Sequence, residues 1–158
     1  MAPVIGGLLV TFGATVVAAV IGGAASVSAS EFYARLAKPT WAPPGAVFGP
    51  VWTVLYAMMA TSAWLVYRSG SPNTKPLLAL FLAQLCLNAL WSWTFFKWES
   101  GAGSIATIMG LWLAIVLLVV GFWRVSPLAG MLLIPYLSWV TFAAVLNGTI
   151  WRMNPTLL

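Results

Sequence analysis

Residues 100–123 read SGAGSIATIMGLWLAIVLLVVGFW, a run that contains no charged side chain. A helix needs about 20 apolar residues to cross the hydrocarbon core of a bilayer, and this run meets that requirement. Four further stretches, 1–30, 39–67, 76–96 and 125–151, are also free of charged side chains, and each of them is long enough to span the membrane. The sequence therefore predicts five membrane-spanning helices.

The composition indicates the same class of protein. Of the 158 residues, 62% are apolar and 6% are charged, and the mean hydropathy is +1.00, whereas about 25% of the residues in a soluble domain are charged. Because the spans use nearly the whole chain, we expect one all-α integral membrane domain over residues 1–158. We place its helices at about 3–25, 45–67, 76–96, 102–123 and 127–151. Pro50 and Pro135 fall inside two of these ranges and are expected to kink them.

The few charged and metal-ligating residues exclude several functions. The net charge is +5, but the basic residues are scattered among the predicted helix ends, which argues against a nucleic-acid partner. There is no histidine and one cysteine, Cys86, so the usual zinc and haem-iron ligand sets are missing and we expect neither a metal nor an intrinsic cofactor. No carboxylate lies within a span, which argues against proton-coupled transport, and no buried base is present to activate a nucleophile.

The distribution of basic residues gives a weak indication of orientation. Five crossings place the two termini on opposite sides of the membrane, and Arg68, Lys75 and Arg124 then share the side of the N-terminus. The other side has Arg35, Lys38, Lys97 and Arg152. The positive-inside rule therefore slightly favours a cytoplasmic C-terminus.

The longest connection, residues 26–44, is predicted to be a lid over the end of the bundle. Its last part, residues 38–44, reads KPTWAPP, and the three prolines remove backbone donors and favour extended geometry. Trp41 stands at the centre of this stiff segment, and Tyr33 belongs to a short helical turn before it. An aromatic side chain on a stiff segment is more typical of a lid than of a flexible linker.

Small residues recur every fourth position in the first predicted helix, at Ala14, Ala18, Gly22 and Ser26. Such a face lets another backbone approach closely, so we expect it to pack against a neighbouring helix. Ala79 and Ala83 have the same spacing in the third predicted helix, and we expect a homodimer through this pair.

Three predicted helices carry aromatic side chains at intervals of three and four, which places them on one helix face. The stripes are Trp52, Tyr56 and Met59; Gln84, Asn88, Trp91 and Phe95; and Tyr136, Trp139, Phe142, Ala143 and Leu146. An amide within the bilayer is costly unless it faces the bundle interior or a ligand. Asn88 is therefore expected either to form an interhelical hydrogen bond or, with indoles beside it, to line a pocket. A nearly uncharged pocket with indole N–H donors from Trp52 and Trp139 suits a large planar hydrophobic ligand.

Several motifs in the same order resemble the TspO/MBR family, the tryptophan-rich sensory proteins related to the mitochondrial translocator protein. They are KPTWAPP at 38–44, PVWTVLY at 50–56, QLCLNALW at 84–91, PYLSWVTFAAVLN at 135–147 and WR at 151–152. This resemblance implies a five-helix bundle, usually dimeric, whose first loop closes a pocket for porphyrins and synthetic aromatic ligands. The pocket residues carried over by motif are Tyr33, Trp41, Trp52, Asn88, Trp91, Trp139, Phe142 and Ala143, to which the stripes add Tyr56, Gln84, Phe95 and Leu146.

The stripes and the resemblance together leave three alternative functions open. The first is a membrane receptor or sensor for porphyrins such as protoporphyrin IX or haem, linked to tetrapyrrole metabolism and oxidative stress. The second is an enzyme that degrades protoporphyrin IX with light and oxygen, with Trp52 and Trp139 as the reacting side chains. The third is a transporter of sterols, lipids or small metabolites. We expect a bacterial cytoplasmic membrane, although the family is also reported in mitochondrial and some bacterial outer membranes.

Overall fold

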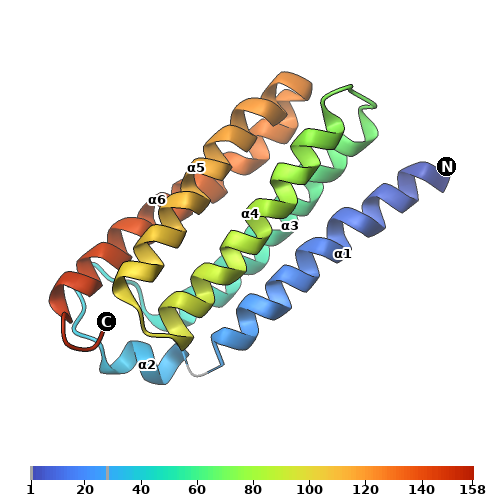
Figure 1. The fold of residues 1–158 in the computed structure, drawn as a ribbon. Helices are drawn as coiled ribbons and strands as arrows, with labels where there is room; N and C mark the ends of the chain where they lie inside the picture. Colours follow the sequence, from blue (N-terminus) through green and yellow to red (C-terminus); the bar gives the residue numbers. More distant parts are fainter. Residues whose placement is uncertain (1, 28) are drawn as a thin grey trace.

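The computed structural model describes residues 2–27 and 29–158 and shows a bundle of helices (Figure 1). Within these residues, five helices are long and apolar enough to cross a membrane, and no strand is present. The predicted all-α membrane fold is thus confirmed, and the chain is a multi-pass integral membrane protein. Its long helices are α1 (Ala2–Ala25), α3 (Phe48–Arg68), α4 (Thr74–Ser92), α5 (Gly101–Val125) and α6 (Pro127–Met153).

Three short elements complete the chain. Residues 26–44, expected to be a lid loop, contain the helix α2 (Ala29–Arg35), which is followed by residues 36–44, here called the strap. A 3-10 turn, η1 (Gly45–Val47), leads into α3, and a π-helical turn, η2 (Trp93–Lys97), continues α4. The N–H of Trp98 donates to the carbonyl of Trp93 at 2.8 Å, five residues earlier, as a π turn requires. The helix expected over 76–96 therefore ends in a widened turn.

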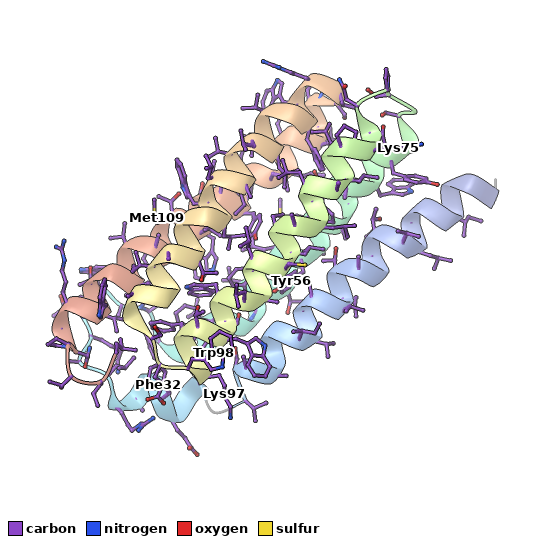
Figure 2. All side chains as sticks on the ribbon, viewed as in Figure 1. Phe32, Tyr56, Lys75, Lys97, Trp98 and Met109 are labelled. Carbon is purple, nitrogen blue, oxygen red and sulfur yellow. The ribbon has the colours of Figure 1, made fainter. Side chains whose placement is uncertain are left out.

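The helices α3, α4, α5 and α6 form the body of the bundle, and α1 lies along its edge against α3 and α4 (Figure 1). The helix α2, the strap and the C-terminus gather at one end of the molecule. The N-terminus and the connection between α3 and α4 lie at the other end. Phe32 and Lys97 mark the first end and Lys75 marks the second (Figure 2). The termini thus lie at opposite ends, as five crossings require.

Large apolar side chains fill the interior of the bundle, and the outer surface of the helices is apolar as well. Met59, Phe81 and Phe122 are almost completely buried. On the outside, Met109 projects from α5 with 52% of its surface exposed, and Val20 of α1 is 65% exposed (Figure 2). Exposed apolar side chains on a membrane-spanning helix face the acyl chains of the lipid.

The small-residue face of α1 packs against α4, as the sequence predicts. Ala18 and Gly22 are buried. A Cβ atom at Gly22 would lie 3.3 Å from Oγ of Ser92 and 3.7 Å from Cα of Ala89. This close approach fixes the position of α1 beside α4 near the end of the bundle that α2 covers.

The two prolines differ in their effect. Because α3 begins at Phe48, Pro50 lies in its first turn, where a backbone N–H would have no partner within the helix. Pro50 thus lies within a helix as expected, but in the first turn its ring removes no hydrogen bond of that helix, so the reason for the expected kink is absent. Pro135 lies inside α6 as predicted, at a position where the ring removes one hydrogen bond of the helix.

Candidate functional site

A cavity of about 460 Å³ lies between α1, α3 and α4 at the end of the bundle covered by α2. Its volume falls within the range of about 300–1,000 Å³ that is usual for small-molecule sites. No charged side chain is found among its described lining residues, which are Ala19, Gly22, Gly23, Ser26, Ala29, Tyr33, Gly45, Phe48, Gly49, Trp52, Thr53, Tyr56, Trp91, Ser92 and Phe96. Among the described residues, no group of three side chains that could ligate a metal comes together. The cavity is therefore suited to an apolar molecule.

An aromatic wall forms one side of this cavity. Trp52 and Tyr56 are one helical turn apart on α3, with ring centroids 5.6 Å apart, and Trp91 of α4 lies 6.3 Å from Trp52. The rings are inclined by 34° in the first pair and by 37° in the second, so the three rings are in contact along this side of the cavity. In the described part of the chain the indole N–H of Trp52 has no hydrogen-bond partner. This wall therefore offers stacking surface together with one free donor.

Tyr33 of α2 closes the end of the cavity. Its hydroxyl donates to the carbonyl of Pro43 at 3.2 Å, and the ammonium of Lys38 lies 4.8 Å from its ring centroid. Burial raises the pKa of the Tyr33 phenol, so this phenol stays protonated and able to donate at neutral pH. The Lys38 ammonium also donates to the carbonyls of Tyr33 and Leu36, at 2.6 and 3.0 Å. These contacts hold the strap over α2.

Asn154, just beyond α6, fastens the strap to the bundle. Its amide oxygen accepts the N–H of Ala37 at 2.9 Å, and its amide nitrogen donates to the carbonyl of Ala37 at 2.9 Å. The same nitrogen donates to the carbonyl of Ile150 at 2.8 Å. Asn154 is only 5% exposed. Sequence reasoning missed it, because nothing in its neighbourhood along the chain indicates a partner as distant in sequence as Ala37.

Asn88 and Gln84 lie behind the aromatic wall and do not line the cavity. The hydroxyl of Tyr56 donates to Oδ1 of Asn88 at 2.6 Å, and Nδ2 of Asn88 donates to the hydroxyl of Tyr136 at 3.0 Å. The Tyr136 hydroxyl in turn donates to Oε1 of Gln84 at 2.8 Å. Of the two roles expected for Asn88, the structure thus displays the interhelical hydrogen bond. Asn88 is connected to the cavity only through the hydroxyl of Tyr56, whose side chain lines it.

A second group of aromatic side chains contacts Phe48 but lies outside the large cavity. Trp139 and Phe142 of α6 have centroids 5.4 Å apart, Phe48 lies 5.9 Å from Trp139, and Trp41 of the strap lies 5.9 Å from Phe142. None of the three predicted residues Trp41, Trp139 and Phe142 lines the 460 Å³ cavity. The buried indole nitrogen of Trp139 has no hydrogen-bond partner among the described residues. Such an unpaired buried donor is uncommon and is able to serve a bound molecule.

A smaller cavity of about 20 Å³ lies between the two regions. Phe95, Ala143 and Leu146, all predicted site residues, line it together with Tyr33 and Trp91. Tyr33, Phe48, Trp91 and Phe96 line both cavities. These four rings therefore separate the large cavity from the side of the site formed by α6.

The sequence did not indicate three parts of the site. The first is the wall contributed by α1, where Gly22 and Gly23 line the cavity. The second is Phe96, which joins Phe95 at the site because η2 inserts a wider turn, and the two rings lie 4.9 Å apart. Asn147 also belongs here, since its Oδ1 accepts the indole N–H of Trp91 at 3.0 Å. The motif that contains Asn147 gives no sign of this partner.

Five membrane-spanning helices, with an uncharged, aromatic cavity between α1, α3 and α4 at the end that α2 covers, define a multi-pass membrane protein with an apolar site. The sequence profile of the TspO/MBR family matches residues 10–152. The chain belongs to this family, which contains the translocator and tryptophan-rich sensory proteins.

Curated relatives agree with this assignment. The tryptophan-rich protein TspO of Chlorobaculum tepidum is 44% identical over 129 residues, which cover 80% of this chain and 82% of that protein. The translocator protein of Homo sapiens is 38% identical over 127 residues, covering 78% and 75% of the two chains. The tryptophan-rich sensory protein of Cereibacter sphaeroides is 38% identical over 125 residues, covering 78% and 77%.

Proposed function

We propose that this protein is a membrane receptor or sensor that binds porphyrins and related planar hydrophobic molecules, and that it acts in tetrapyrrole and oxidative-stress regulation. The observation that carries the proposal is the uncharged 460 Å³ cavity with its wall of Trp52, Tyr56 and Trp91. A large conjugated ring stacks on such a wall at little desolvation cost, because both surfaces are apolar. The name of the relative from Cereibacter sphaeroides, a tryptophan-rich sensory protein, supports a sensory role.

Protoporphyrin IX is the ligand that tests this proposal. We expect saturable quenching of tryptophan fluorescence when it is added in the dark to the purified protein in detergent. Trp52→Phe removes the free indole N–H and part of the stacking surface, so we expect about tenfold weaker binding. Trp112→Phe is the matched control, because Trp112 lies on α5 away from the cavity and donates to Oγ1 of Thr141. Quenching that never saturates, or equal losses in both variants, would contradict the proposal.

A second candidate function is the photochemical degradation of bound protoporphyrin IX. It is favoured by two indoles that lack hydrogen-bond partners among the described residues, Trp52 at the cavity and Trp139 behind Phe48. In this function the porphyrin absorbs light and is oxidised, dioxygen accepts its electrons, and the two indoles pass these electrons on or trap reactive oxygen. The double variant Trp52→Phe with Trp139→Phe is then expected to bind porphyrin and to lose the light-driven decay of its absorption band. Decay at the wild-type rate would remove this candidate.

The membrane and the oligomeric state belong to the same proposal. We place the protein in a bacterial cytoplasmic membrane, as a homodimer in contact with lipid. The α4 face with Ala79 and Ala83 is exposed and free of bulky side chains at those two positions, so a second copy can approach it closely. Transport remains the third alternative, and flux above that of empty vesicles in proteoliposomes is the observation that would favour it.

A further inference from the structure

Besides its aromatic side chains, the cavity is lined by small residues from two helices. On α1 these are Gly22 and Gly23, in its last turn, and on α3 they are Gly49 and Thr53, in its first two turns. Gly23, Gly49 and Thr53 are exposed at the surface of the bundle as well as lining the cavity. The cavity-lining residues that are exposed at this level therefore have small side chains.

The contacts of α1 explain why the wall is thin here. Near the opposite end, Gly7 lies directly against the ring of Tyr67, so α1 and α3 are in close contact there. Near the cavity, α1 is held to α4 instead, because Gly22 touches Ala89 and Ser92 and the indole N–H of Trp93 donates to the carbonyl of Ile21 at 3.1 Å. A Cβ atom added at Gly23 would meet no atom within 4 Å.

The same is true of Gly49 on the facing helix, where an added Cβ would also meet no atom within 4 Å. The hydroxyls near this gap are already occupied, since Thr53 donates to the carbonyl of Gly49 at 3.0 Å and Ser26 donates to the carbonyl of Gly22 at 3.1 Å. The gap between Gly23 and Gly49 therefore presents no free donor from these hydroxyls, and its surface suits an apolar molecule.

We propose that the gap between Gly23 of α1 and Gly49 and Thr53 of α3 is a side opening, through which a ligand dissolved in the bilayer reaches the cavity. The proposal rests on the proposed function for the identity of its ligand. The end of the bundle that faces water is covered by α2 and the strap, which Tyr33, Lys38 and Asn154 hold in place. A planar hydrophobic molecule concentrates in the membrane, and the side opening lets it reach Trp52 without crossing water.

The position of the side opening also defines the ligand. Thr53 is about 7.5 Å along the axis from the start of α3, at about 1.5 Å per residue, so the opening lies near one surface of the membrane. A molecule that enters here has an apolar ring within the hydrocarbon and polar groups that stay at the lipid headgroups. The side opening is thus suited to amphipathic planar molecules rather than to sugars, nucleotides or ions.

Phenylalanine at either glycine tests the proposal, because there is space for the first atom of the side chain and the ring would obstruct the gap. We compare Gly23→Phe and Gly49→Phe with Gly13→Phe, which is exposed on α1 and also has no atom within 4 Å of an added Cβ, but does not line the cavity. In lipid nanodiscs loaded with protoporphyrin IX, stopped-flow quenching is expected to show association and dissociation both slowed by about tenfold in the first two variants. Because both glycines also line the cavity, the slowed association is the diagnostic result, and Gly13→Phe is expected to associate at the wild-type rate.

Two outcomes would overturn the side opening while leaving porphyrin binding intact. In one, all three variants bind at the wild-type rate. In the other, the first two variants bind at the wild-type rate but release faster, which would mean that the new ring enters the cavity without obstructing a route.

A second measurement needs no porphyrin and so separates this proposal from the proposed function. A nitroxide is attached at Thr53→Cys in a Cys86→Ala background, and its collision rates with dioxygen and with a water-soluble nickel complex are measured in liposomes. High accessibility to dioxygen and low accessibility to nickel would support an opening into hydrocarbon, and the reverse would overturn it. If the wild-type protein binds no porphyrin, the proposed function is wrong, and the nitroxide result alone decides the side opening.

Discussion

At Asn88 a single amide links three helices. It accepts from Tyr56 of α3 and donates to Tyr136 of α6, while its own backbone belongs to α4. With 1% of its surface exposed, this side chain has no alternative partner in water. Hydrogen bonds of this kind in membrane proteins contribute about 0.6 kcal/mol each on average.

We therefore expect Asn88→Leu to lower the free energy of unfolding by about 1 kcal/mol through the two lost hydrogen bonds, while protoporphyrin affinity changes little. A thermal melt in detergent, followed by a porphyrin titration, measures both quantities. Thr61→Ala serves as the control, because the Thr61 hydroxyl donates to the carbonyl of Ala57 in its own helix, in an exposed position. An unchanged melting temperature combined with a large loss of affinity would show that Asn88 meets the ligand instead.

At the scale of the elements, the strap depends on one side chain at the end of α6. Asn154 bonds to both the N–H and the carbonyl of Ala37. Two other polar contacts of the strap, Tyr33 with Pro43 and Lys38 with the carbonyl of Leu36, lie within residues 29–44. Among the described residues, the Asn154 side chain is thus the main polar attachment of the strap to the membrane helices.

Asn154→Ala is expected to leave the five spans folded and to let the strap separate from the bundle. Backbone amides in the strap should then exchange hydrogen faster by about one order of magnitude, the equivalent of about 1.4 kcal/mol of lost hydrogen bonding. Hydrogen exchange followed by mass spectrometry measures this effect. Asn73→Ala, in the connection at the opposite end, is the control and should leave exchange in the strap unchanged. Equal exchange in both variants would mean that apolar packing alone holds the strap.

An element could be predicted from the sequence when the residues that make its contacts recur at helical spacing along the chain. The stripe of Trp52 and Tyr56 follows from helical spacing, and the two rings do lie together at the cavity. The widened turn η2 could not be foreseen, because an extra residue in a turn leaves no mark in an apolar sequence, and Phe96 was missed with it. The small residues of α1 predicted contact with a neighbour, yet spacing alone could not show that Gly23 faces a gap.

At the scale of the whole molecule, the two ends differ in charge. The end with the N-terminus has Arg68, Lys75 and Arg124 and no acidic residue in its connections. The end with α2 has Arg35, Lys38, Lys97 and Arg152, together with Glu31 and Glu99. The positive-inside rule counts basic residues and largely ignores acidic ones. The comparison that sets the orientation is therefore three basic residues at the first end against four at the second. The five spans follow directly from hydropathy, but their orientation rests on this narrow margin.

We expect the double variant Lys97→Gln with Arg152→Gln, which leaves two basic residues at the strap end against three, to insert partly in the inverted orientation. The only ion pair found in the described residues, Arg35 with Glu99, is untouched by these changes. The measurement is labelling of Asn73→Cys in a Cys86→Ala background by a membrane-impermeant maleimide on intact cells, and we expect less labelling in the double variant. Labelling equal to that of the parent protein would show that other features of the chain set the orientation.

The position of α1 at the edge of the bundle also bears on how the protein is made. Synthesis produces α1 before its partners, which begin at Phe48 for α3 and at Thr74 for α4. Until these helices are made, α1 lies in the bilayer without them, where a polar group without a hydrogen bond raises the free energy. Thr11 and Thr15 meet this condition, because their hydroxyls donate to carbonyls of Gly7 and Thr11 in the same helix. The hydroxyls of Thr11 and Thr15 are thus already bonded within α1 before the helices that pack against it have been synthesised.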